Sequence, residues 1–91
     1  MQVVHDIHTH RFTAELASGT AILSYAPAGE DVLDLFSTYV PPAERGRNVA
    51  SQLVEAALSY ARRDGFRVIP TCWYVDLWIR RHPEHADLLA R

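Results

Sequence analysis

The residues with the clearest chemical potential lie where a strand is expected to end and a helix to begin. Arg45 and Arg47 flank Gly46 here, and guanidinium groups bind phosphate through forked donors. A helix N-terminus adds unpaired N–H groups and partial positive charge. Gly46 permits close backbone approach, and the small side chains of Ala50 and Ser51 leave room. The pattern indicates a pyrophosphate site, although a capped helix with solvated arginines explains it equally well.

Later in the chain, Cys72 and Tyr74 are two side chains that could take part in chemistry. Cys72 follows a predicted strand and precedes a predicted helix starting near Tyr74, whose N–H groups would stabilise a thiolate. It could act as a nucleophile, or it could be an inert buried thiol. The phenol of Tyr74 could act as a proton donor, or its ring could pack in the core.

A third cluster lies at the start of the chain, where Asp6, His8 and His10 follow His5. The Asp-x-His-x-His spacing resembles the first metal motif of amidohydrolase-type barrels, and histidines two apart on a strand share a face. Such barrels need ligands on many later strands, and 91 residues are too few to build one. We therefore expect no metal site, and we interpret residues 1–10 as an N-terminal strand or a frayed tail.

Periodicity and turn residues predict the elements that position these groups. Alternating apolar residues indicate strands, and a wide apolar stripe at helical spacing indicates one long helix. Proline and glycine mark the turns. The predicted elements are strands over 11–16, 20–26 and 32–40, a helix over 47–64, a strand over 66–71, a short helix around Val75, Trp78 and Ile79, and a last turn opened by Pro83.

The predicted order is β-β-β-α-β-α, an α/β fold with a mixed sheet. The helix between strands 32–40 and 66–71 implies a parallel pair with a right-handed crossover. Short turns join the first three strands, which we expect to be antiparallel. Residues 11–91 are interpreted as a single domain, preceded by a polar, His-rich segment over 1–10.

Composition narrows the class of partners. The net charge of −2 provides no overall positive potential that would attract nucleic acid, so we expect no nucleic-acid partner. No apolar run has the roughly 18 residues of a membrane helix, so we expect no membrane partner. The single cysteine excludes an internal disulfide, and a reduced, cytoplasmic setting is expected.

Four stretches together resemble the short N-acetyltransferase-like branch of the GNAT acetyltransferase superfamily. Residues 45–50 are similar to its acetyl-CoA pyrophosphate loop, Arg/Gln-x-x-Gly-x-Gly/Ala. The flanking residues 38–41 and 50–54 also resemble this branch. Residues 68–75 match its Ile-Pro-x-Cys-x-Tyr-Val motif, and 81–84 with 88–89 match its C-terminal tail.

The resemblance implies a minimal GNAT-like fold in which the splayed parallel pair 32–40 and 66–71 forms the CoA cleft. Main chain near Val40 would bind the pantetheine arm and polarise the thioester carbonyl, with Cys72 and Tyr74 at the far side. The implied CoA-binding residues are Val40, Arg45, Gly46, Arg47, Asn48, Val49, Ala50 and Ser51.

Two positions depart from the branch. Asn48 replaces the middle glycine of the loop, and asparagine tolerates positive φ better than most residues. Ser37 stands where the branch usually has histidine before threonine.

The implied activity is transfer of an acetyl group from acetyl-CoA to an unidentified primary amine, without metal, by direct attack or through Cys72. The alternatives are a CoA-binding module without efficient catalysis and a metal-dependent hydrolase using the N-terminal histidines. We expect a monomer or a small homo-oligomer.

Overall fold

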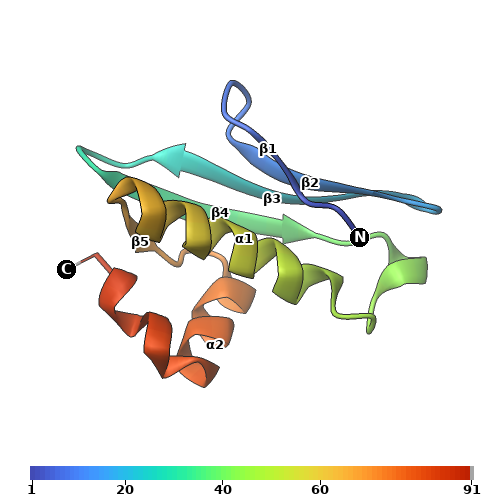
Figure 1. Ribbon diagram of the computed structural model, residues 1–91. Helices are drawn as coiled ribbons and strands as arrows, with labels where there is room; N and C mark the ends of the chain where they lie inside the picture. Colours follow the sequence, from blue (N-terminus) through green and yellow to red (C-terminus); the bar gives the residue numbers. More distant parts are fainter. Residues whose placement is uncertain (91) are drawn as a thin grey trace.

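The computed structural model describes residues 1–90, whose five strands form one sheet in the order β1-β2-β3-β4-β5 (Figure 1). The strands are β1 (Val4–Asp6), β2 (Arg11–Leu16), β3 (Gly19–Pro27), β4 (Val32–Tyr39) and β5 (Arg67–Ile69). The helices are α1 (Val49–Asp64) and α2 (Trp73–Arg81), with 3₁₀ turns η1 (Pro42–Glu44) and η2 (Pro83–Leu88). Neighbouring strands are antiparallel except for β4 and β5, which are parallel. The predicted mixed α/β fold is confirmed, and β1 precedes the predicted elements.

Two predicted elements, the long helix and the fourth predicted strand, differ from the structure by at least two residues at one end, for local reasons. Helix α1 begins at Val49 rather than Arg47, because Gly46 and Asn48 have φ of +82° and +66°, and a right-handed helix cannot include such residues. Strand β5 spans three residues instead of six, since Pro70 has no N–H with which to extend the ladder.

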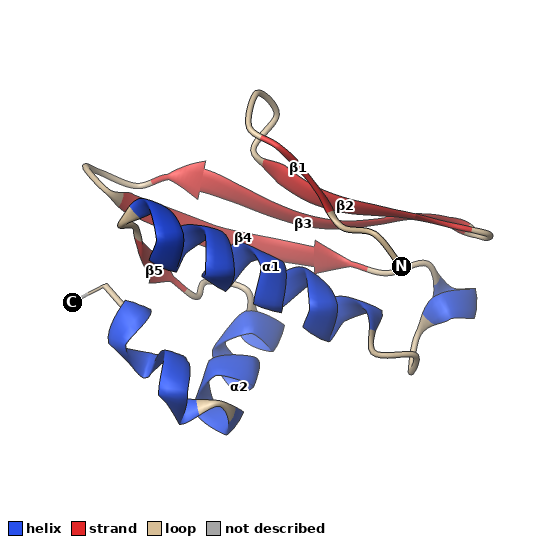
Figure 2. Cartoon of the chain, viewed as in Figure 1, coloured by secondary structure: helices blue, strands red, loops and turns tan. Residues whose placement is uncertain are grey.

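One face of the sheet is covered by α1, and α2 lies beside that helix (Figure 2). From α1, Leu53, Val54 and Leu58 are fully buried. They pack in one core cluster with residues of the sheet and α2, including Phe12, Leu23, Leu35, Val68 and Val75. Burial of a side chain of this size contributes roughly 1.5–3 kcal/mol. No helix within residues 1–90 is long and apolar enough to span a membrane.

Strand β4 contains a bulge that determines which side chains face α1. Tyr25 pairs with Leu35 and Ser24 pairs with Ser37, so Phe36 has no partner on β3. Directly opposed residues share a face. Thr38, opposite the buried Leu23, therefore lies on the α1 side, where strict alternation from Leu35 would have placed Ser37.

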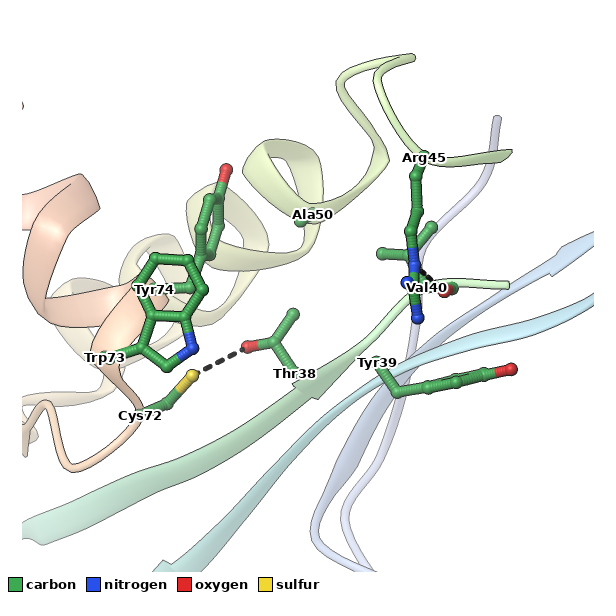
Figure 3. Close-up of a pocket in the computed structure, with 8 residues that line it drawn as sticks. All are labelled: Thr38, Tyr39, Val40, Arg45, Ala50, Cys72, Trp73 and Tyr74. Carbon is green, nitrogen blue, oxygen red and sulfur yellow. Dashed lines mark hydrogen bonds between the residues drawn. The ribbon is translucent and has the colours of Figure 1, made fainter. Parts of the chain in front are cut away.

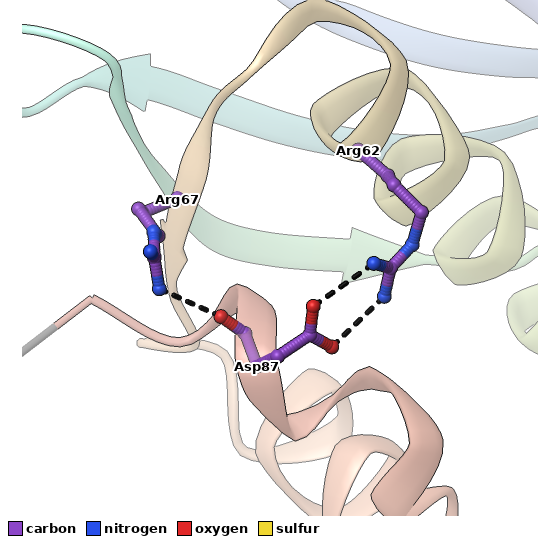
Figure 4. Close-up of polar contacts among 3 residues, drawn as sticks. All are labelled: Arg62, Arg67 and Asp87. Atoms are coloured by element: carbon purple, nitrogen blue, oxygen red, sulfur yellow. Dashed lines mark hydrogen bonds and ion pairs between the residues drawn. The ribbon is translucent and has the colours of Figure 1, made fainter.

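The C-terminal segment is fastened to α1 and β5 through Asp87 (Figure 4). Arg62 donates two hydrogen bonds of 2.9 Å to the Asp87 carboxylate, and Arg67 donates one of 2.7 Å to its carbonyl oxygen. The predicted turn from Pro83 is confirmed as η2. These contacts hold η2 against the end of α1.

The N-terminal segment pairs with β2, which resolves the alternative between a strand and a frayed tail. The His5 ring stacks on Phe12 at 4.1 Å between centroids, and the Tyr60 ring meets it edge-on at 4.3 Å. His5 Nε2 lies 2.6 Å from the Tyr25 hydroxyl. In the described part of the chain, residues 1–90, no three His, Cys, Asp or Glu side chains gather as a possible metal site.

This packing predicts a pH dependence of stability. Burial, reinforced by the positive charge of Arg63, lowers the pKa of His5 below its ordinary 6.5. As the pH falls below 6.5, the unfolded chain takes up a proton at His5 that the folded chain resists, so the free energy of unfolding should decrease. The decrease should level off below the lowered pKa, where both states are protonated.

Denaturant titrations at a series of pH values would measure this effect. His5→Phe should remove a large part of the decrease, whereas His8→Phe, at an exposed position, should retain it. An unchanged pH profile in His5→Phe would show that other groups are responsible.

Candidate functional site

A cleft of about 400 Å³ opens at the end of β4 (Figure 3). It exists because β4 and β5 pair only from Val32 to Asp34 on β4, after which β4 continues to Tyr39 paired with β3 but without β5. This is the predicted divergence of the parallel pair. The cleft is lined by Thr38, Tyr39, Val40, Arg45, Ala50, Cys72, Trp73 and Tyr74.

A second hollow, of about 390 Å³, lies against the first turn of α1. Val40, Arg45, Ala50 and Tyr74 line both spaces, so the two form one groove running from Cys72 to the start of α1. The remaining residues of the second hollow are Glu44, Gly46, Asn48, Val49 and Ser51. We call the combined space the groove.

The α1 end of the groove presents main-chain donors. Asn48 is the N-cap residue of α1, and its side chain makes no capping hydrogen bond. The first N–H groups of a helix have no partner within it, and the first turn of α1 holds no acidic residue. The prediction that Asn48 can adopt a positive φ is confirmed. This end of the groove therefore has the polarity of an anion site.

The two loop arginines differ in position. Arg45 Nε donates a 3.0 Å hydrogen bond to the Val40 carbonyl oxygen, and Figure 3 shows its guanidinium beside Val40. Arg47 lines neither hollow; its side chain is 73 % exposed and lies 4.0 Å from Glu44. Among the predicted CoA-binding residues, Arg47 is the one that the structure leaves outside the groove.

Glu44 is a groove residue that sequence reasoning missed. Its carboxylate accepts a 2.9 Å hydrogen bond from the Ser18 hydroxyl, which ties the turn between β2 and β3 to the loop before α1. In the sequence, its position next to Arg45 indicates that it could line the same site. The contact with Ser18, 26 residues away, was not visible in any local pattern.

At the other end of the groove, Cys72 is the N-cap residue of α2, one residue earlier than predicted. It is 9 % exposed, and its Sγ lies 3.5 Å from Thr38 Oγ1. Its main-chain N–H donates to Leu35 O at 2.9 Å. The sequence predicted Cys72 at a helix start but did not identify Thr38 as its neighbour.

Tyr74 contributes a phenol to both hollows. Burial raises the pKa of this phenol above its ordinary 10.0, although the charge of Arg81 opposes the shift. The group is therefore protonated at neutral pH and available as a proton donor. Its ring meets the 74 % exposed Trp73 edge-on.

The groove thus joins an end that carries main-chain donors, the Arg45 guanidinium and the Glu44 carboxylate to an end that carries a thiol, a threonine hydroxyl and a phenol. Such a space suits an elongated ligand with an anionic group at α1. Ser37, which replaces the histidine usual in the branch, is exposed and lines neither hollow. This replacement therefore lies outside the groove.

A mixed sheet with this parallel divergence, and a donor-rich loop before the crossover helix, define an acetyltransferase-type fold. Residues 11–88 match the family model of GCN5-related N-acetyltransferases, and the chain belongs to this family. The resemblance identified in the sequence is confirmed.

Relatives include Protein NATD1 of Gallus gallus, 35 % identical over 85 residues that cover 91 % of this chain and 77 % of that protein. Protein NATD1 of Homo sapiens is 34 % identical over 85 residues, covering 91 % and 75 %. The structure is similar, with a TM-score of 0.74, to the NMR solution structure of a GCN5-like protein from Staphylococcus aureus, covering 98 % of this chain and 87 % of that one. At 14 % identity, this second likeness concerns the fold alone.

Proposed function

We propose that this protein transfers the acetyl group of acetyl-CoA to a primary amine, with the groove as the CoA site. The observation that carries the proposal is the continuity of the groove, which joins the α1 N-terminus and Arg45 to Thr38, Cys72 and Tyr74. Family membership supports the same chemistry.

The pyrophosphate would lie against the first N–H groups of α1, which are suited to phosphate. Arg45 would add charge-assisted hydrogen bonds through its terminal nitrogens, since its Nε is occupied by Val40 O. A carbonyl oxygen has two lone pairs, so Val40 O could still accept from a pantetheine amide. Arg45 would thereby contact both the pyrophosphate and Val40, the residue that would bind the pantetheine arm.

In the reaction, the neutral amine attacks the thioester carbonyl carbon, and a main-chain N–H near Val40 would stabilise the oxyanion. The attack forms the C–N bond, and collapse of the tetrahedral intermediate breaks the C–S bond. The leaving thiolate takes a proton from Tyr74, and the proton released by the amine passes to solvent, from which Tyr74 is reprotonated. The products are an N-acetylated amine and CoA.

A CoA-binding module without efficient catalysis is the second candidate. The observation in its favour is Asn48, whose side chain stands at the N-cap of α1 where the family loop has glycine. A side chain at this point crowds the approach of phosphate to the main chain.

Calorimetric titration with acetyl-CoA, followed by a CoA-release assay with a panel of primary amines, tests both candidates. Binding with amine-dependent release of CoA supports the transferase. Binding without release by any amine supports the binding module, and the absence of heat at millimolar acetyl-CoA contradicts both.

We expect transfer to be direct, with Cys72 unacetylated during turnover. The thiol is 9 % exposed and lies against Thr38, which restricts attack on a thioester. Intact-protein mass spectrometry during turnover should show no acetyl adduct, and Cys72→Ala should retain amine acetylation. A hydroxylamine-sensitive acetyl group on the wild type, absent from Cys72→Ala, would establish the covalent relay instead.

A further inference from the structure

One hydrogen bond connects the groove to a buried residue behind it. The indole N–H of Trp78, on α2, donates to the Ser51 hydroxyl oxygen at 2.8 Å. Ser51 belongs to the first turn of α1 and lines the second hollow. Trp78 is 5 % exposed and does not line the groove.

This bond determines what the Ser51 hydroxyl can offer to a ligand. An indole N–H donates and never accepts, whereas a hydroxyl has one proton and two lone pairs. Because the Ser51 oxygen accepts from Trp78, its own proton is directed to a different acceptor. Donation to the oxygen also strengthens the hydroxyl as a donor, since linked hydrogen bonds polarise one another.

The surroundings hold Trp78 in this orientation. The His82 ring stacks on the indole at 3.7 Å with an interplanar angle of 13°, and His82 Nδ1 lies 2.7 Å from the Trp78 carbonyl oxygen. A buried N–H without a partner destabilises the fold, so the indole favours keeping its bond to Ser51. The hydroxyl oxygen is therefore held in place before any ligand arrives.

We propose that Trp78 is a positioning residue that fixes the Ser51 hydroxyl as a donor to a phosphate oxygen of the ligand. The proposal rests on the function proposed above and adds a further source of phosphate affinity to those of Arg45 and the main chain of α1. A phosphate offers acceptors where the groove presents a donor, so the Trp78–Ser51 pair favours phosphorylated ligands over phosphate-free ones.

A double-mutant cycle tests this role with two probes, acetyl-CoA and its phosphate-free analogue S-acetylpantetheine. Ser51→Ala should weaken acetyl-CoA binding about tenfold, which is typical of one hydrogen bond to a charged group. Trp78→Phe should weaken it about threefold, and the double variant should match Ser51→Ala, because Trp78 acts only through that hydroxyl. Affinity for S-acetylpantetheine should stay unchanged in all three variants.

Equal losses for both probes, or lowered melting temperatures with unchanged acetyl-CoA affinity, would show that the bond is merely structural and overturn the proposal. Failure of the wild type to bind acetyl-CoA would overturn the proposed function as well. Binding by the wild type with additive effects in the cycle would overturn only the role of Trp78.

A spectroscopic signal gives an independent readout. The ¹H–¹⁵N indole resonance of Trp78 can be assigned by its disappearance in Trp78→Phe. Adding adenosine 3′,5′-bisphosphate to the wild type should shift this resonance, because the phosphate accepts from the hydroxyl to which the indole is bonded. An unmoved indole resonance at saturating bisphosphate would contradict the proposal even if the variants bind less tightly.

Discussion

Replacing Arg45 with alanine should weaken acetyl-CoA binding by about ten- to a hundredfold, the range expected for losing a hydrogen bond to a charged group. Arg45 is the loop arginine that lines both hollows of the groove. Its Nε bond to Val40 O holds the guanidinium in place before the ligand binds. The variant would remove both the positive charge near the phosphates and the hydrogen bond to the Val40 carbonyl oxygen.

Isothermal titration with acetyl-CoA measures the effect, and Arg80→Ala is the matched control. Arg80 lies on α2, is 75 % exposed in its side chain and pairs with Asp76 on the same helix. Arg62 would be a poor control because its two bonds to Asp87 hold the C-terminal segment. Similar losses in the Arg45 and Arg80 variants would indicate a general charge effect and contradict a local phosphate contact.

Replacing Tyr74 with phenylalanine should lower kcat by about a hundredfold or more, while the KM for acetyl-CoA changes little. Loss of a positioned proton donor typically has an effect of this size. Burial raises the pKa of this phenol above its ordinary 10.0, so the phenol carries its proton at neutral pH and can donate it to a leaving thiolate. Phenylalanine preserves the ring that lines the groove, so binding should survive.

Steady-state kinetics with the best amine of the panel would provide both constants. Tyr60→Phe is the matched control, because it removes a phenol that belongs to the aromatic cluster around His5 rather than to the groove. A Tyr74→Phe variant with unchanged kcat would show that the thiolate leaves without this acid. A rise in KM alone would assign Tyr74 to binding.

The elements nearest to the groove were largely predictable because their signals are local. A helical stripe, the arginine-glycine loop and the Ile-Pro-x-Cys-x-Tyr-Val stretch identified the crossover helix and the segment that faces it. The predicted start of α1 was wrong because propensity alone does not reveal that Asn48 adopts a left-handed conformation. The length of β5 was overestimated because Pro70 stands inside a run of otherwise strand-forming residues.

By itself, the sequence determined the α/β class, the order of elements from β2 to α2, and a family whose members share that order. These features depend on periodicity, turn residues and short motifs, which involve neighbours along the chain.

Only the tertiary structure decided which distant groups meet. Thr38 and Cys72 lie 34 positions apart, and Ser51 and Trp78 lie 27 apart. Their contacts depend on the bulge at Phe36 and on the packing of α2 against α1. A one-residue change of strand register moves a side chain to the opposite face, and no local pattern specifies that register.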